Sequence, residues 1–136
     1  MRYLAIDYGA KRTGLALCDA GETIASPYSV LHGQKSLVQR IDRVVVSENI
    51  EAIVLGLPLN MDDSEGPQAK KVRAFAKELQ SHIPVPVYFQ DERLSSFGAE
   101  QKLEEIGLSK GKRLERLDAL AAAEILQAFL EQKARS

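Results

Sequence analysis

The chain has 136 residues, enough to bury a proper hydrophobic core, and residues 1–136 are expected to form a single domain. Hydrophobic residues make up 45% of the sequence and charged residues 27%, a balance that excludes intrinsic disorder. No apolar stretch is long enough to cross a bilayer, no signal-peptide pattern opens the chain, and the net charge of −1 gives no general attraction to nucleic acid. We therefore expect a soluble, cytoplasmic protein with no membrane partner.

Three short strands are predicted at the start of the chain. Residues 2–8 are apolar and β-favouring, residues 15–18 form a second apolar run, and residues 23–30 form a third strand. Short turns between successive strands are typical of an antiparallel meander. Pro27 interrupts the third strand, so this strand is expected at a sheet edge or at a bulge. The only cysteine, Cys18, cannot form an internal disulfide and is expected to be a buried thiol.

The middle of the chain alternates between helices and strands. Apolar residues at helical spacing predict a helix over residues 34–49, and the continuous apolar run 52–58 predicts a strand that is buried on both faces. After a polar, acidic surface loop, Pro67 suits the first turn of a helix that ends at about Ser81. Residues 87–90 are predicted to form a short fifth strand.

Two further helices are predicted near the end of the chain. Ser95 and Ser96 are suitable caps for a helix that runs to Ile106. The basic segment 110–113 is interpreted as a flexible connection, and residues 114–132, rich in alanine and leucine, as the last helix. This order of elements indicates a mixed α/β sheet with helices on both sides.

A basic turn follows the first strand. Asp7 ends that strand, and Lys11 and Arg12 lie between two glycines, Gly9 and Gly14. A carboxylate at the end of a buried strand requires a cation or hydrogen-bond donors, and the glycines would let two cationic side chains approach an anion closely. This stretch indicates a binding site for phosphate or for a metal ion. A β-hairpin whose acid caps a turn explains it equally well.

Three acidic residues occupy special positions. Asp7 ends the first strand, Glu92 follows the last strand, and Asp118 lies on the final helix, on the same face as Ala121, Ala122 and Ile125. Small alanines would let this helix lie close to the sheet and point Asp118 inward. If the first, fourth and fifth strands are parallel neighbours, Asp7 and Glu92 emerge together at the carboxyl edge, where open α/β sheets bind ligands.

Carboxylates without an accompanying histidine or cysteine favour a hard ion such as Mg²⁺ or Mn²⁺. Two such ions, about 3.5–4 Å apart, can activate water and stabilise the leaving oxygen in phosphodiester cleavage. Six cationic residues could then bind the nucleic-acid backbone: Lys11, Arg12, Arg93, Lys112, Arg113 and Arg116. Ordinary surface ion pairs, of Glu92 with Arg93 and of Asp118 with Arg116, are the alternative.

Four motifs occur in one order across almost the whole chain: residues 7–14 (DYGAKRTG), 56–58 (GLP) with 60–62 (NMD), 91–96 (DERLSS) and 118–122 (DALAA). In these motifs the chain resembles the YqgF/RuvX family of Holliday-junction-resolvase-like nucleases. The resemblance implies an RNase H-like α/β fold with a five-stranded mixed sheet, in which the first three strands are antiparallel, and with helices on both faces.

The same resemblance implies a function and a site. Asp7, Glu92 and Asp118 would carry metal-dependent nuclease chemistry on structured RNA or on DNA junctions. For bacterial members it implies maturation of the 5′ end of 16S ribosomal RNA, with junction resolution as the older proposal. Asp63 stands where glycine is expected, which leaves the shape of the loop after Pro58 open.

Two other functions are compatible with the residues. A nucleic-acid-binding module with an inactive site would show salt-sensitive binding without hydrolysis. A phosphotransferase lobe is the second, because an Asp-x-Gly hairpin also opens the actin and sugar-kinase fold, although that fold needs two lobes around its nucleotide. The choice between RNA and DNA, between one and two ions, and between monomer and homodimer stays open.

Overall fold

The computed structural model describes residues 1–94 and 110–136, so the helix predicted from Ser95 and Ser96 to Ile106 lies outside the described residues. Within the described part, the elements in chain order are β1 (Tyr3–Asp7), β2 (Arg12–Cys18), β3 (Ala25–His32), α1 (Leu37–Ser47), β4 (Ala52–Leu57), α2 (Pro67–His82), β5 (Val87–Asp91), the short 3₁₀ helix η1 (Glu92–Leu94) and α4 (Lys110–Arg135). The strands and the first two helices lie where the sequence pattern predicts them, with small shifts at their ends.

The five strands form one mixed sheet in the order β3-β2-β1-β4-β5. β1 pairs antiparallel with β2, and β2 with β3, whereas β1, β4 and β5 are parallel neighbours. The predicted five-stranded arrangement with three antiparallel strands is therefore confirmed. Every residue of β4 is buried, as expected for a strand covered on both faces.

β3 is an edge strand, and its pairing with β2 is irregular between Leu15 and Ala16. Pro27 lies opposite Ala16 at this irregularity, which is where a residue without an N–H group is tolerated. β3 begins at Ala25, two residues later than the predicted start. The carboxylate of Asp19 accepts the backbone N–H groups that precede this residue and thereby holds them in a turn.

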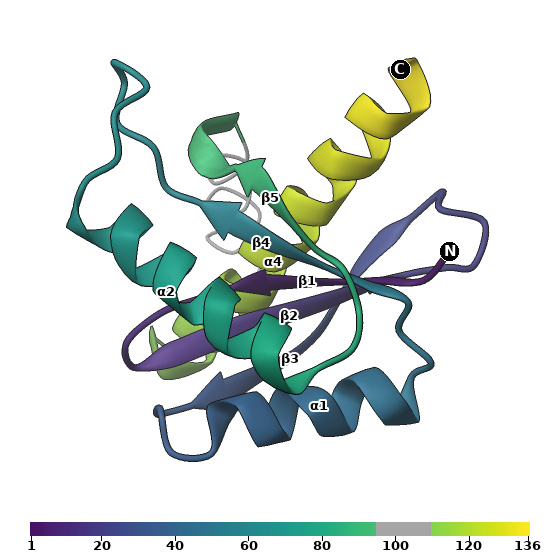
Figure 1. Cartoon of the computed structure of the whole chain (residues 1–136), viewed down its shortest axis with the longest axis horizontal. Coiled ribbons are helices and arrows are strands. Elements are labelled where there is room, and N and C mark those ends of the chain that lie inside the picture. Colours follow the sequence, from purple (N-terminus) through teal and green to yellow (C-terminus); the bar gives the residue numbers. More distant parts are fainter. Residues whose placement is uncertain (95–109) are drawn as a thin grey trace.

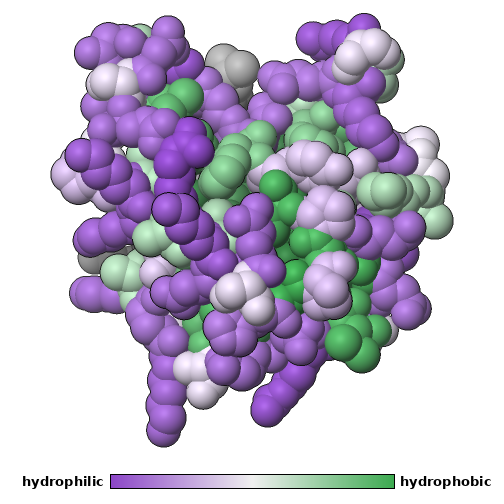
Figure 2. Space-filling model, viewed as in Figure 1, coloured by the Kyte–Doolittle hydropathy of each residue, from purple (hydrophilic) through white to green (hydrophobic). Residues whose placement is uncertain are grey.

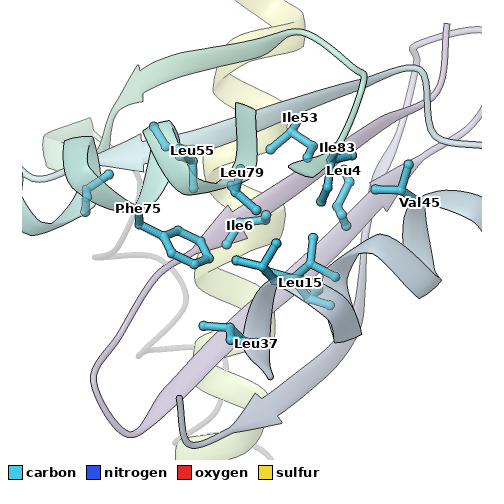
Figure 3. Packing of buried hydrophobic residues seen from close by; sticks show 14 of the residues in the cluster. Leu4, Ile6, Leu15, Leu37, Val45, Ile53, Leu55, Phe75, Leu79 and Ile83 are labelled. Carbon is cyan, nitrogen blue, oxygen red and sulfur yellow. The ribbon is translucent and has the colours of Figure 1, made fainter. Parts of the chain in front are cut away.

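Helices cover both faces of the sheet (Figure 1), with α1 and α2 on one side and α4 crossing the other. The layer under α1 and α2 is built from large side chains, and Figure 3 shows them converging between the helices and the strands. Its largest fully buried members include Leu4, Ile6, Leu15, Ile41, Ile53, Leu55 and Leu79. Figure 2 shows the outside of this same layer, where hydrophilic residues cover most of the surface.

The layer under α4 is built largely from small residues. Its buried members are Tyr3, Ala5, Ala16, Cys18, Ala52, Val54, Ala122, Ala123, Ile125, Leu126 and Leu130. The expected burial of Cys18 is confirmed, because only 3% of this residue is exposed. Small side chains let α4 lie close to the sheet, as the alanine content of the helix predicts.

Two expectations for the last helix are corrected. α4 begins at Lys110, so segment 110–113 is helical rather than a flexible connection. One glycine costs a helix only about 1 kcal/mol, and the neighbouring lysine and arginine residues favour helix. The buried face of α4 includes Ala119, Ala122 and Ala123, whereas Ala121 is half-exposed. Among the described residues, no helix combines the length and the apolar character needed to cross a membrane.

Candidate active site

The carboxyl edge of the parallel strands brings two of the three predicted acids together. Asp7 is the last residue of β1, and Glu92 follows directly after β5. Because β1, β4 and β5 are parallel, their ends point to the same side of the sheet, as Figure 1 shows. Residues alternate between the two faces of a strand, and Tyr3 and Ala5 of β1 lie under α4. Asp7 therefore lies on the α4 face.

The carboxyl groups of Asp7 and Glu92 share a hydrogen bond. Burial is the main cause that raises the pKa of Glu92, and the hydrogen bond to Asp7 and the negative charges of Asp7 and Asp91 raise it further. Burial also raises the pKa of Asp7, while the hydrogen bond from Glu92 opposes this shift. Two buried carboxyl groups in hydrogen-bond contact cannot both be ionised without strong repulsion, so the pair shares a proton.

Asp118 reaches the same site from α4. The Arg12 Nε–H donates to Asp118 Oδ2 over 2.6 Å, and 23% of the Asp118 side chain is exposed. The negative charge of Asp118 contributes to the raised pKa of Asp7. The three acids thus come from segments far apart in sequence and interact electrostatically at one edge of the sheet.

A glycine in β2 explains how α4 comes so close. Gly14 pairs with Asp7 across the β1–β2 ladder, and a Cβ atom on Gly14 would lie only 2.0 Å from the carbonyl oxygen of Asp118. Only glycine leaves room for this contact between backbones. The backbone of Asp118 is consequently held over the strand residue that neighbours Asp7.

A second glycine makes room for Glu92. A Cβ atom on Gly56 would lie 2.5 Å from Glu92 Oε1 and equally close to Ile125 Cδ1. Gly56 belongs to β4, between the strand that ends in Asp7 and the strand that precedes Glu92. The side chain of Glu92 therefore passes over the backbone of β4 on its way towards Asp7.

Arg93 is held by the protein itself. Its guanidinium donates to both carboxylate oxygens of Asp91, at 2.6–3.1 Å, and to the carbonyl oxygen of Asn60 at 2.9 Å. It also forms an ion pair with Asp63 Oδ1 at 2.8 Å. The alternative pairing of Arg93 with Glu92 is thus wrong for the described contacts. Arg93 instead ties the loop after β4 to the segment that carries Glu92.

The unusual residue in that loop has a clear backbone role. Asp63 has a φ angle of +69°, in the left-handed region that favours glycine. This conformation accounts for the expectation of glycine at the position. The side chain of Asp63 adds the ion pair with Arg93 and remains 80% exposed. These contacts of Arg93 with residues some 30 positions away have no local signal in the sequence.

The other predicted cationic residues are placed unevenly. Lys11 is exposed in the turn between β1 and β2, and Arg116 is exposed on α4. Asp118 forms its ion pair with Arg12 and not with the predicted partner Arg116. The side chains of Lys112 and Arg113, in the first turns of α4, lie outside the described part of the structure. Of the predicted cations whose side chains are described, Lys11 and Arg116 are thus the exposed ones.

The donor set suits a hard divalent ion, because it consists only of carboxylate oxygens. The described residues nevertheless contain no group of three histidine, cysteine or acidic side chains already arranged as metal ligands. The contacts explain this. Asp7 and Glu92 are hydrogen-bonded to each other, and Asp118 is paired with Arg12. An ion at the site would therefore replace the shared proton and compete with Arg12.

Comparison with solved structures defines the class of fold. RuvC of T. thermophilus in complex with a Holliday junction substrate superimposes with a TM-score of 0.62 at 19% identity, covering 100% of this chain and 98% of RuvC. The fowlpox virus resolvase in complex with Holliday junction DNA gives a TM-score of 0.61 at 16% identity, covering 98% and 99% of the two chains. The fold is RNase H-like, of the type found in these resolvases.

Sequence comparison then identifies the family. Relatives from Bartonella henselae (41% identical, covering 93% of this chain and 81% of the relative) and from Syntrophomonas wolfei (42%, covering 96% and 94%) are both named "Putative pre-16S rRNA nuclease". The family model described as "RuvX: Holliday junction resolvase" matches residues 1–132. The chain belongs to the RuvX family, a family of nucleases, and the resemblance noted in the sequence is confirmed.

Proposed function

We propose that the chain is a metal-dependent nuclease that hydrolyses phosphodiester bonds in structured nucleic acid. The observation that carries this proposal is the convergence of Asp7, Glu92 and Asp118 at the carboxyl edge of the sheet. Burying Asp7 and Glu92 beside each other and near a third acid costs free energy, because desolvation and mutual repulsion disfavour their charged forms. Such a costly cluster at a ligand-binding edge is typical of a catalytic site.

In this proposal Asp7, Glu92 and Asp118 hold Mg²⁺ or Mn²⁺. When bound, such an ion lowers the pKa of a water molecule and stabilises charge on the phosphate oxygens. The protein contributes the position of the acids, which is set by the contacts at Gly14 and Gly56. The exposed side chains of Lys11 and Arg116 would bind the phosphate backbone beside the cleavage site.

The proposed natural substrate is the precursor of 16S ribosomal RNA, cleaved at its 5′ end in the cytoplasm. The names of the Bartonella and Syntrophomonas relatives support this choice over a DNA junction. Resolution of Holliday junctions is the second candidate, because the T. thermophilus and fowlpox virus proteins of the same fold were solved with junction DNA.

Cleavage assays with matched variants test the proposal. The substrates are a precursor 16S fragment with its 5′ extension, an unstructured RNA of equal length and a four-way DNA junction, each with Mg²⁺, Mn²⁺ or EDTA. We expect Asp7→Asn and Glu92→Gln to lose at least about 100-fold in rate. Glu131→Gln makes the same change on an exposed part of α4 and should retain full activity.

The outcomes separate the candidate functions. Equal cleavage by wild type and Asp7→Asn would remove Asp7 from the chemistry. Salt-sensitive binding of all variants without metal-dependent hydrolysis would indicate a binding module instead. Stoichiometric ATP binding in a calorimetric titration would favour a phosphotransferase. Preference for the junction over the precursor RNA would support the resolvase function.

A further inference from the structure

Arg12 makes an unexpected contact for a residue predicted to bind nucleic acid. Its Nε–H donates to Asp118 Oδ2 over 2.6 Å, a distance typical of a strong charge-assisted hydrogen bond. The two residues are 106 positions apart, so the contact comes from the packing of α4 on β2. The cation that would bind substrate is therefore engaged by an acid that would bind metal.

We propose that Arg12 is an exchangeable counter-ion, which neutralises Asp118 in the free protein and moves to a phosphate group of the nucleic acid when substrate binds. This exchange leaves Asp118 available to a divalent cation, so that nucleic acid and metal bind cooperatively. The inference rests on the proposed nuclease function, because it assumes that Asp118 is a metal ligand.

The charges at the site favour exchange over simultaneous binding. A divalent ion on Asp118 would stand within a few ångströms of the guanidinium of Arg12, and two cations at that distance repel each other. Both side chains are also partly open to solvent, with 32% of Arg12 and 23% of Asp118 exposed. The contact can therefore open without unfolding its surroundings.

Strand pairing and hydrogen bonds hold the backbone around Arg12, so the exchange requires movement of its side chain alone. Arg12 is the first residue of β2 and pairs with His32 of β3. Gln34 Nε2 donates to the carbonyl oxygens of Gly9 and Ala10, at 2.8 and 3.1 Å. The Gly33 N–H donates to the carbonyl oxygen of Lys11 at 2.8 Å. These bonds tie the turn to the segment that follows β3.

A phosphate group is a suitable new partner for Arg12. The guanidinium fits phosphate oxygens as well as it fits carboxylate oxygens, so the exchange replaces one charge-assisted hydrogen bond with another. Lys11 is exposed on the same turn and would attract the phosphate backbone to this position. Asp118 forms its ion pair with Arg12. The adjacent Lys11 carries the same charge, so a substitution of Lys11 is a matched control for the Mn²⁺ titration without nucleic acid.

Calorimetric titration of the full chain with Mn²⁺ tests the exchange without relying on activity. In the absence of nucleic acid, Arg12→Gln should bind Mn²⁺ about 3- to 10-fold more tightly than wild type, because Asp118 loses its competitor. Lys11→Gln removes the same charge one residue away and should change the affinity by less than about 2-fold. Equal tightening in both variants, or weaker binding by Arg12→Gln, would overturn the proposal.

A second titration tests the coupling to nucleic acid. A four-way DNA junction, kept cold and shown by gel to stay intact, should raise the Mn²⁺ affinity of wild type several-fold. It should raise the affinity of Lys77→Gln equally, because this variant removes an exposed lysine of α2, on the face of the sheet opposite to α4. It should leave the affinity of Arg12→Gln unchanged, because no counter-ion remains to be exchanged. An equal gain in all three proteins would refute the exchange.

The outcome can be separated from that of the proposed function. Wild-type cleavage without this coupling would leave the nuclease function standing and remove the exchange. Coupling without cleavage of any substrate would leave the exchange as a property of a binding protein.

Discussion

The variant Gly14→Ala tests whether the contact between β2 and α4 positions Asp118. The added Cβ would lie 2.0 Å from the carbonyl oxygen of Asp118 and 2.4 Å from its carbonyl carbon, whereas ordinary contact begins at about 3.4 Å. Because both atoms belong to the backbone, no side-chain rotation removes the clash. The helix must retreat from the strand by about 1.4 Å, the difference between 3.4 and 2.0 Å.

This retreat should affect stability and catalysis together. Overpacking of a tight contact costs typically about 1–3 kcal/mol, and we expect the upper part of this range because the clash involves two backbones. A displacement of a catalytic group by about 1 Å can cost about 100-fold in rate. Gly14→Ala should therefore unfold at lower urea concentration and cleave at least about 100-fold more slowly while it is still folded.

Gly33→Ala is the control for a glycine substitution without a clash. Gly33 has a φ angle of +74°, and a Cβ atom added there would meet no atom within 4 Å, so alanine at this position adds backbone strain alone. The variant should lose about 1 kcal/mol and keep its cleavage rate. Urea unfolding and cleavage are measured on the same samples. If Gly14→Ala cleaves at the wild-type rate and is no less stable than Gly33→Ala, the positional role of Gly14 is wrong.

Three further predictions concern residues outside the proposed metal site. Asp63→Gly relieves left-handed strain while losing an exposed ion pair, so urea unfolding should shift by less than about 0.5 kcal/mol, and Asp63→Ala should be about 1 kcal/mol less stable than the glycine variant. Equal stability of the two variants would contradict this account. Burial raises the pKa of the Cys18 thiol, so a thiol reagent should modify native protein only as it unfolds, and rapid labelling in native buffer would disagree. Hydrogen bonds from the N–H of Ile24 and from Thr23 lower the pKa of Asp19, so its contribution to stability is complete above its unfolded pKa of about 4 and is lost as pH falls. The difference in unfolding free energy between wild type and Asp19→Asn should shrink below about pH 4, as urea titrations at several pH values can show, and a difference independent of pH would exclude this role.

The sheet and the positions of two acids could be predicted because they depend on local patterns. The apolar run from Ala52 indicates a strand buried on both faces, Pro27 indicates an edge strand, and the structure places both strands accordingly. Asp7 and Glu92 end parallel strands, so their meeting at one edge required only that the strands be neighbours. The alanine-rich face of the last helix predicted that Asp118 points inward at the same edge.

The contacts of the two arginines could not be predicted, because they depend on distant segments. The sequence presents Arg12 and Arg93 as substrate-facing cations, yet the structure pairs them with Asp118 and with Asp63 and Asp91. The partner of a charged residue depends on which side chains the fold brings near it, and the spacing of residues along the chain does not predict that partner. The early start of α4 escapes prediction for a related reason, since Gly111 suggests a break although a long helix tolerates one glycine.

The two layers of buried residues, one on each face of the sheet, differ in the substitutions that they tolerate. Large branched side chains fill the α1–α2 layer, and exchanges among such residues usually cost little when their total volume is kept. The α4 layer is thin, and it carries the acids and both tight glycine contacts. A thermostable derivative is therefore best sought by redesigning the α1–α2 layer, with the sheet acting as a partition that shields the acids from those changes.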